Sequence, residues 1–319
     1  MAAIILKQSF PGYIDRYGVG ADALDKTIDA LRERYNQTVL QGAQFFRTAN
    51  PSGGVYTESS YGTNLQLPPV NNDSDKLPFA GPQKGFKKSF SILTYRLATQ
   101  VERALTEDQL VPVARRMASG LMNSARLLLE YQFADIFNNI TATTATYVGA
   151  DGVAVASASH PFEKAQVGTW SNIESAGALT AANFSTARTN MRKRQSDLGY
   201  KQIVLPKKLV VCADKETQAR TLMASEKVPG GALNDKWVYQ GAVEIVVWDY
   251  LTSTTAWGLW GDIPAEYNTF LYMPEVMPNL APTEGADRST DIIWGERLRM
   301  RHAIGAMGGD RNLQWNVGA

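Results

Sequence analysis

The chain has 319 residues, of which 44% are hydrophobic and 20% are charged, and its formal charge is +1. This composition excludes a disordered chain, and the length suffices for one large domain or for two, with a sizeable core. The balanced charge provides no overall field that would attract nucleic acid or an anionic membrane.

The N-terminal region, 1–48, is predicted to be an extended arm followed by a helix. Residues 1–20 are apolar and aromatic but are interrupted by Pro11 and by glycines. From 22 to 46, apolar residues recur every three or four positions, as on one face of a helix. The first ten residues lack the basic and long apolar segments of an export signal, so we expect no export.

The stretch 49–85 is rich in Pro and Gly and has no helical pattern. Loops longer than about 15 residues are uncommon in compact domains and are usually functional or disordered. The insert is flanked by residues typical of strands, which predicts a long two-stranded excursion. These residues are Val55, Tyr56, Thr57 and Tyr61 on one side and Phe90, Ile92, Thr94 and Tyr95 on the other. An isolated ribbon is marginally stable, so it needs another surface, and that surface could belong to a neighbouring molecule.

The longest helical pattern runs over 112–140, where two series of apolar residues step by threes and fours. A helix of this length spans roughly 40 Å, which is more than one compact core is expected to cover. An ordinary core helix is the alternative to a helix with two apolar faces. The candidate packing residues are Met122, Leu128, Leu129, Phe133 and Phe137.

The rest of the chain is predicted to combine hairpins, strands and short helices. Residues 141–170 hold Gly, Pro and short Val- and Ala-rich runs, which is typical of hairpins. Thr180 is the expected N-cap of a helix whose buried face continues to Leu198, and Asp214 is the expected N-cap of a second helix. Strands are expected at 209–213, 243–248, 256–260, 270–273, 292–303 and 313–317.

Residues that carry chemistry are scarce. His160, His302 and the single cysteine, Cys212, are too few for a zinc site, and Cys212 is expected to be buried in a protein of a reducing compartment. No phosphate-binding, dinucleotide, nucleophile-elbow or metalloprotease pattern is present. Ser157 and Ser159 precede His160, but turn chemistry explains them better than a nucleophile and its base. We therefore expect no catalytic residue, no cofactor and no metal.

Two basic groups have a structural and a functional interpretation. The first lies at the end of the helix that follows Thr180, where cations complement the helix dipole, so a solvated face is favoured over phosphate binding. It comprises Arg188, Arg192, Lys193 and Arg194. The second is either a partner-binding patch or a charged loop edge. It comprises Lys84, Lys87 and Lys88.

The order of several segments resembles a known family. In 206–262, a strand near Pro206 precedes a helix with an Ala-x-x-Leu-Met-x-Ser pattern from Ala219, an Asn-containing loop, a Val-rich strand and a Trp-rich strand. The helix end 133–138, the sequence Ser-His-Pro at 159–161 and the tail 299–315 agree with the same order. Together with the arm, the insert and the long helix, this order resembles the major capsid proteins of tailed bacteriophages, which share the Hong Kong 97-type coat fold.

The resemblance implies an α+β chain divided into an N-terminal arm, an extended E-loop that lies across a neighbouring subunit, a peripheral domain and an axial domain. The ranges are 1–48 for the arm and helix, 49–98 for the E-loop, 99–202 with 286–319 for the peripheral domain, its spine helix 112–140, and 203–285 for the axial domain. In this layout Lys84, Lys87 and Lys88 are candidates for contacts between subunits. At least one of Met122, Leu129, Phe133 and Phe137 is expected to contact a neighbouring subunit.

The implied function is structural: self-assembly, as hexamers and pentamers, into the icosahedral head shell that encloses the double-stranded DNA genome. The short arm implies a separate scaffolding protein, beside a portal and an optional decoration protein. The protein would contact packaged DNA only non-specifically, would assemble in the host cytoplasm and would reside in the virion, with no membrane partner. Two alternatives remain open: an encapsulin-like shell around protein cargo, and a soluble α/β enzyme or ligand-binding protein.

Overall fold

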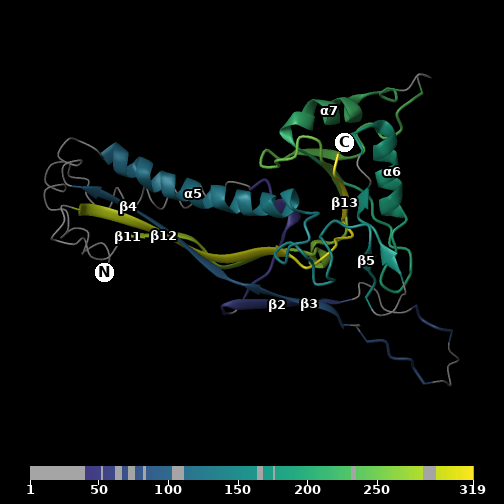
Figure 1. Cartoon of the computed structure of the whole chain (residues 1–319), viewed down its shortest axis with the longest axis horizontal. Coiled ribbons are helices and arrows are strands. Elements are labelled where there is room, and N and C mark those ends of the chain that lie inside the picture. Colours follow the sequence, from purple (N-terminus) through teal and green to yellow (C-terminus); the bar gives the residue numbers. More distant parts are fainter. Residues whose placement is uncertain are drawn as a thin grey trace.

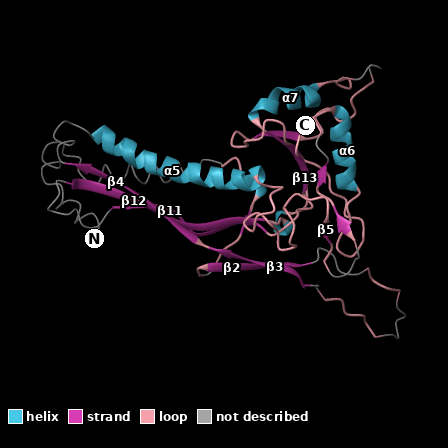
Figure 2. Cartoon of the chain, viewed as in Figure 1, coloured by secondary structure: helices cyan, strands magenta, loops and turns pink. Residues whose placement is uncertain are grey.

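The computed structural model describes residues 40–51, 53–61, 67–70, 76–81, 84–102, 111–163, 168–174, 177–230, 235–282 and 292–318. The expected arm and most of the expected helix 22–46 lie outside the described residues. The described residues form an elongated part, a rounded unit at one end of it and a projecting ribbon (Figure 1). The elongated part is called the arm from here on and is distinct from the expected N-terminal arm. Helices and strands both build the body, as in an α+β fold (Figure 2).

The elongated arm is built on a four-stranded sheet in the order β1-β11-β12-β4. Its strands are β1 (Arg47–Thr48), β11 (Phe270–Pro282), β12 (Ile292–Ala306) and β4 (Leu93–Glu102). β11, β12 and β4 are antiparallel neighbours, and β1 adds a short parallel edge. β11 and β12 span 13 and 15 residues, more than twice the usual strand length of about 5–6 residues. The sheet is therefore long and narrow.

Helix α5 (Val111–Asn138) lies along one face of this sheet (Figure 1). It confirms the long helix that the sequence predicted at 112–140. Its apolar positions meet the side chains of the long strands, so the arm has a small core of its own. That core comprises Leu121, Met122 and Ala125 of α5 with Leu280, Leu298 and Met300 of the sheet.

The C-terminal half of α5 enters the main hydrophobic core, in which aromatic rings dominate. Phe133 and Phe137 are at most 1% exposed, and the ring of Phe137 stacks on that of Phe270 with 5.0 Å between centroids. The 3-10 helix η1 (Ala43–Phe45) brings Phe45 to 5.4 Å from Trp248, measured between ring centroids. Because this cluster also contains residues of the rounded unit, it joins that unit to the arm.

The rounded unit contains a five-stranded sheet in the order β7-β13-β10-β8-β9. Its strands are β7 (Ile173–Glu174), β13 (Leu313–Asn316), β10 (Trp257–Trp260), β8 (Lys208–Val211) and β9 (Glu244–Val247). Helices α6 (Ala181–Arg192) and α7 (Glu216–Ala224) share a second core with this sheet. Thr180 caps α6 as predicted, since its hydroxyl oxygen accepts a hydrogen bond from the N–H of Asn183 at 3.2 Å.

The ribbon consists of β2 (Val55–Tyr61) and β3 (Lys84–Ser91), which pair antiparallel as the sequence predicted. It lies on the other side of the four-stranded sheet from α5 (Figure 1). At its root, Phe90 packs with residues of that sheet in a separate apolar cluster. A second short pair, β5 (His160–Pro161) with β6 (Thr169–Trp170), lies in the region predicted to form hairpins.

Four sequence-based boundaries are wrong. Residues 40–46 form a turn and η1, not the end of an α-helix. Asp214 lies inside a 3-10 helix, η2 (Ala213–Lys215), so it is not the N-cap of α7. Leu198 lies beyond the end of α6. Thr94 and Tyr95 belong to β4 and not to the ribbon, because they pair with β12. In each case a local pattern was extended beyond the residues that form the element.

The spatial units also cross the domain boundaries that the sequence predicted. β11, assigned to 203–285, pairs with β12 and belongs to the four-stranded sheet of the arm. α6 and β13, assigned to 99–202 and 286–319, belong to the rounded unit. The partners of β13, which are β10 and β7, lie far from it in the chain, whereas β11 and β12 are consecutive strands that the predicted boundary at 285/286 separated.

Candidate functional site

The root of the β2–β3 ribbon is tied to the body by Lys88. Its Nζ donates hydrogen bonds to the carbonyl oxygen of Val148 at 2.7 Å and to that of Ala306 at 3.0 Å. Burial lowers the pKa of Lys88. Since this ammonium group is bonded within its own chain, Lys87, which is exposed, is the better placed of the two for a contact with a neighbour. Lys84 lies in β3, and its side chain is outside the described residues.

A second tie joins the ribbon to β1. Arg47 forms an ion pair with Glu58 of β2 at 3.1 Å, and the hydroxyl of Tyr56 donates a hydrogen bond to the other oxygen of the same carboxylate. Burial and this hydrogen bond raise the pKa of Tyr56. The root of the ribbon is thus held from two sides.

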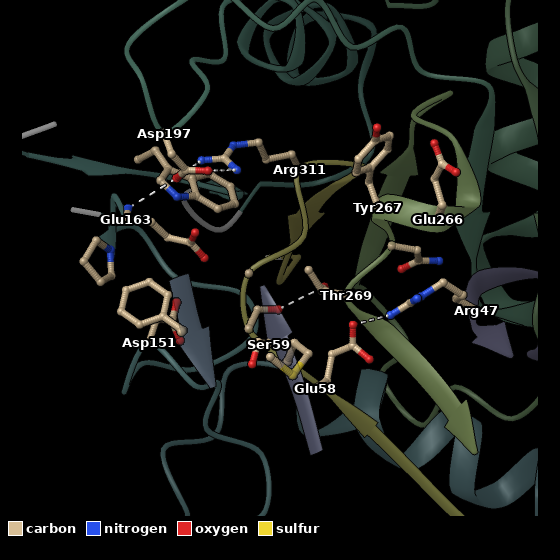
Figure 3. Close-up of a pocket in the computed structure, with 17 residues that line it drawn as sticks. Arg47, Glu58, Ser59, Asp151, Glu163, Asp197, Glu266, Tyr267, Thr269 and Arg311 are labelled. Carbon is tan, nitrogen blue, oxygen red and sulfur yellow. Dashed lines mark hydrogen bonds and ion pairs between the residues drawn. The ribbon is translucent and has the colours of Figure 1, made fainter. Parts of the chain in front are cut away.

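Beside the root lies a cavity of about 340 Å³, lined by the ribbon, by the loops near Asp151 and Asp197 and by 266–269 (Figure 3). Arg311 forms an ion pair with Asp197 at 2.7 Å across its wall. Carboxylates outnumber guanidinium groups in the lining, so the cavity is acidic. The carboxylates are those of Glu58, Asp151, Glu163, Asp197 and Glu266, and the guanidinium groups are those of Arg47 and Arg311.

His160 is a structural residue next to this cavity. Its Nδ1 lies 2.6 Å from Asp151 and its Nε2 lies 3.0 Å from the side-chain oxygen of Asn172. Both ring nitrogens are therefore engaged, and neither is left for Ser157 or Ser159. The Oγ of Ser157 accepts a hydrogen bond from the N–H of Ser159 instead, which is turn chemistry.

His302 is also part of the packing. It is 2% exposed, its Nε2 lies 2.6 Å from Oε1 of Gln132 in α5, and its ring stacks on that of Tyr95 at 4.7 Å. Burial lowers the pKa of His302 to about 4, so the ring is neutral at pH 7. This arrangement links β12 to α5 and β4.

The prediction of a solvated basic face at the end of α6 is wrong for Arg194. Arg194 is 6% exposed and donates hydrogen bonds to the carbonyl oxygens of Arg311 and Leu313. Burial lowers its pKa to about 9. Arg192 and Lys193 are exposed as predicted, whereas the guanidinium of Arg188 lies 4.5 Å from the centre of the Tyr239 ring. The basic run is therefore split between solvent and core.

The candidate packing residues of α5 all lie against the chain itself. Met122, Leu129, Phe133 and Phe137 are less than 5% exposed, and Leu128 is partly buried beside them. This differs from the expectation that one of the first four contacts a neighbouring subunit. Among the side chains of α5 that the structure describes, the large apolar ones that are exposed are Leu127, at 44%, and Tyr131, at 61%. Sequence reasoning missed them, although the run of three leucines at 127–129 signals that one of them must face away from the core.

The segment between β2 and β3 also exposes apolar side chains. Leu67, Leu77 and Phe79 are 63%, 76% and 94% exposed, and Val70 is fully exposed. Contiguous exposed apolar groups on a soluble protein usually mark an interaction site. Among the described residues, no group of His, Cys, Asp or Glu is arranged to hold a metal ion, and no described helix is both long enough and apolar enough to span a membrane.

Solved structures with a similar fold include two phage capsids and a phage-related bacterial protein. The capsid of cyanophage P-SCSP1u superposes with a TM-score of 0.54 at 10% identity and covers 86% of each chain. The procapsid of bacteriophage JBD30 gives 0.52 at 11% identity over 92% of this chain and 74% of the other. A phage-related protein from Bordetella bronchiseptica RB50 gives 0.51 at 14% identity, over 90% and 95%. At these identities the likeness establishes the fold alone.

The family of the chain is assigned from its sequence. No curated protein matches the chain. The model of a family described as phage capsid protein matches residues 86–311, which is well over half of the chain. This match includes α5, the strands β4 and β8 to β12, and the segment 206–262 that carried part of the resemblance in the sequence. The chain therefore belongs to the phage capsid protein family, and it is a structural protein that forms the phage head shell.

Proposed function

We propose that the chain is a major head subunit of the Hong Kong 97 type, which packs as hexamers and pentamers into an icosahedral shell around double-stranded DNA. In this proposal, α5 and the four-stranded sheet form the peripheral domain, and the rounded unit with α6 and α7 is the axial domain at the capsomer centre. The long, narrow shape supports the proposal, because such a tile leaves much of its surface to be covered by neighbours.

The single observation that carries the proposal is the β2–β3 ribbon. A two-stranded ribbon is marginal by itself, yet this one projects from the body (Figure 1), and the segment beyond it exposes Leu67, Leu77 and Phe79. We infer that 49–91 acts as an E-loop that lies across a neighbouring subunit, whereas the end of the predicted range 49–98, from Leu93 onward, belongs to β4. Lys84 and Lys87 would then stand at the contact between subunits.

Other partners follow from the resemblance. A separate scaffolding protein would direct assembly in the host cytoplasm, a portal would occupy one vertex, and a decoration protein would be optional. The charge of +1 supports contact with packaged DNA that is only non-specific.

Electron microscopy of the purified full chain tests this proposal. We expect closed shells or ring-shaped capsomers, and limited proteolysis should cut 49–85 faster in free protomers than in shells. Equal cleavage rates in the two states would contradict the E-loop assignment. Shells that form in the phage-producing cell with protein cargo and no DNA would favour the encapsulin-like alternative, and a monomer under all assembly conditions would reject the shell.

A further inference from the structure

The four-stranded sheet has one face that is covered along its length and one that is covered only at one end. α5 packs on the face that carries Leu298 and Met300. On the opposite face, Phe90 of the ribbon covers the end near Ala303. The rest of that face, on β4 and β12, extends beyond the ribbon (Figure 1), and we refer to it as the open part because most of its described side chains are exposed.

Three exposed arginines occupy the open part: Arg96, Arg297 and Arg299. Arg96 and Arg299 are direct cross-strand partners, which places their Cβ atoms about 4.5–5.5 Å apart, and like charges in that arrangement repel each other. Among the described residues, no carboxylate pairs with any of the three. Arg301, the next residue on this face, is neutralised by Glu275 at 3.2 Å. Within the part of the chain that the structure describes, this surface therefore carries positive charge that no carboxylate compensates.

The side chains around these arginines are small. Thr94, Ala98 and Asn279 pair with residues on the same face and are exposed, so nothing bulky screens the guanidinium groups. A guanidinium group binds a carboxylate through two parallel hydrogen bonds, and arginine is enriched where protein surfaces meet. The chemistry of the surface thus fits an acidic partner.

We propose that this surface, the arginine face (Arg96, Arg297 and Arg299), binds the carboxylates of the segment between β2 and β3 of a second copy of the chain. The inference rests on the proposed function, in which that segment crosses a neighbour. Its carboxylates are those of Asp73 and Asp75, which lie outside the described residues and which the sequence places midway between the two strands.

Two observations favour this occupant over nucleic acid. The segment exposes apolar side chains such as Phe79, which a phosphate backbone cannot cover, whereas the arginine face includes Ala98, the cross-strand partner of Arg297. The segment also points away from the arm of its own chain (Figure 1). A contact between two different surfaces of identical chains is head-to-tail, and such contacts close into rings.

Paired charge reversals test the proposal in cells that produce the full chain with the other head proteins of its phage. We expect Arg96→Glu with Arg299→Glu to lower the shell yield at least about ten-fold while the melting temperature of the protomer stays unchanged. Adding Asp73→Arg and Asp75→Arg should restore shells, because the reversed pair is again complementary. Arg116→Glu is the matched control, since Arg116 is an exposed arginine of α5, which packs on the other face.

In the same assay, the formation of shells by the wild-type chain tests the proposed function. The shell yield of the variant relative to the wild type tests the contact at the arginine face. If the Glu variant does not fold, Arg96→Gln with Arg299→Gln replaces it, and a normal shell yield from that variant overturns the proposal. Rescue by Glu266→Arg instead of the aspartate reversals would assign the contact to the acidic cavity and overturn the proposed occupant. Normal shells that retain less DNA would assign the face to nucleic acid.

Discussion

The carboxylate of Glu130 accepts a hydrogen bond from the backbone N–H of Gly42 at 3.1 Å, which joins the middle of α5 to the segment that leads into β1. Glu130 is fully buried and also accepts a hydrogen bond from the N–H of Gln41. These two donors offset the cost of burying a carboxylate. Any Cβ added to Gly42 would lie 2.6 Å from the Cβ of Phe133 and 2.7 Å from Cζ2 of Trp248, so only glycine fits this approach.

Gly42→Ala is therefore expected to destabilise the protomer. The added methyl group must displace Phe133 or Trp248, and overpacking of this kind costs about 1–3 kcal/mol. Gly120→Ala is the control: nothing lies within 4 Å of its added Cβ, and alanine in a helix interior should stabilise by about 0.5–1 kcal/mol. Denaturant unfolding of both variants measures the difference. A Gly42→Ala protein as stable as the wild type would show that the segment is loosely packed.

Lys88→Met is expected to loosen the ribbon. Without the ammonium group, the carbonyl oxygens of Val148 and Ala306 lose a donor, which costs about 1–3 kcal/mol where they stay buried. Hydrogen exchange of the amides of 84–91 should become faster. Lys87→Met, at the exposed neighbouring position, should change stability by no more than about 0.5 kcal/mol. If both variants exchange at the wild-type rate, the two hydrogen bonds of Lys88 contribute nothing to the attachment of the ribbon.

The stability of the protomer should decrease as the pH falls, because of His302. Burial lowers its pKa in the fold to about 4, below the ordinary 6.5. Between these values the unfolded chain binds a proton that the folded chain does not, so stability is complete above pH 6.5 and is lost as the pH falls towards 4. The loss is at most roughly 3 kcal/mol.

Urea unfolding at pH 7.5 and at pH 4.5 measures this loss. His302→Gln carries no titrating group at this position, so its stability should depend less on pH than that of the wild type over the same interval. Identical pH dependence in the two proteins would mean that other groups, and not His302, cause the acid sensitivity.

The sequence predicted the elements of the fold better than their partners. Periodic apolar residues identified α5, α6 and most strands, because helix and strand periods are local properties. The length of β11 was missed: Pro274 and Pro278 interrupt the strand pattern, yet the ladder continues past both with shifts in register. The assignment of β11 to the arm was missed as well, because the predicted boundary at 285/286 separated it from β12, the next strand in the chain.

The sequence predicted the ribbon as a candidate contact surface, but it did not predict which individual side chains face solvent. Gly and Pro in 49–85 indicated the ribbon, but nothing local showed that Lys88 turns inward to Val148 and Ala306. The arginine face escaped notice because Arg96 and Arg299 are neighbours only through the pairing of β4 with β12. Likewise, the members of both apolar series whose side chains the structure describes pack within the chain, since the core of the arm contains some of them and the main core contains the others.

Leu127 and Tyr131 are the side chains of α5 that we now expect to act in assembly. Leu129→Ala and Phe133→Ala remove groups that are at most 1% exposed, so they should cost the protomer roughly 2–5 kcal/mol. Leu127→Ala removes an exposed group and should change protomer stability by no more than about 0.5 kcal/mol. Tyr131→Ala also removes the edge-to-face contact of its ring with Tyr250, 5.3 Å between centroids, and should cost about 0.5–1.5 kcal/mol. Their removal should nevertheless lower the yield of shells, since exposed apolar groups of an assembling protein mark its contacts. Melting temperature and shell yield, measured side by side for the four variants, separate the two effects. Should Leu127→Ala and Tyr131→Ala both assemble like the wild type, this side of α5 faces solvent in the shell, and the helix serves only the core of its own subunit.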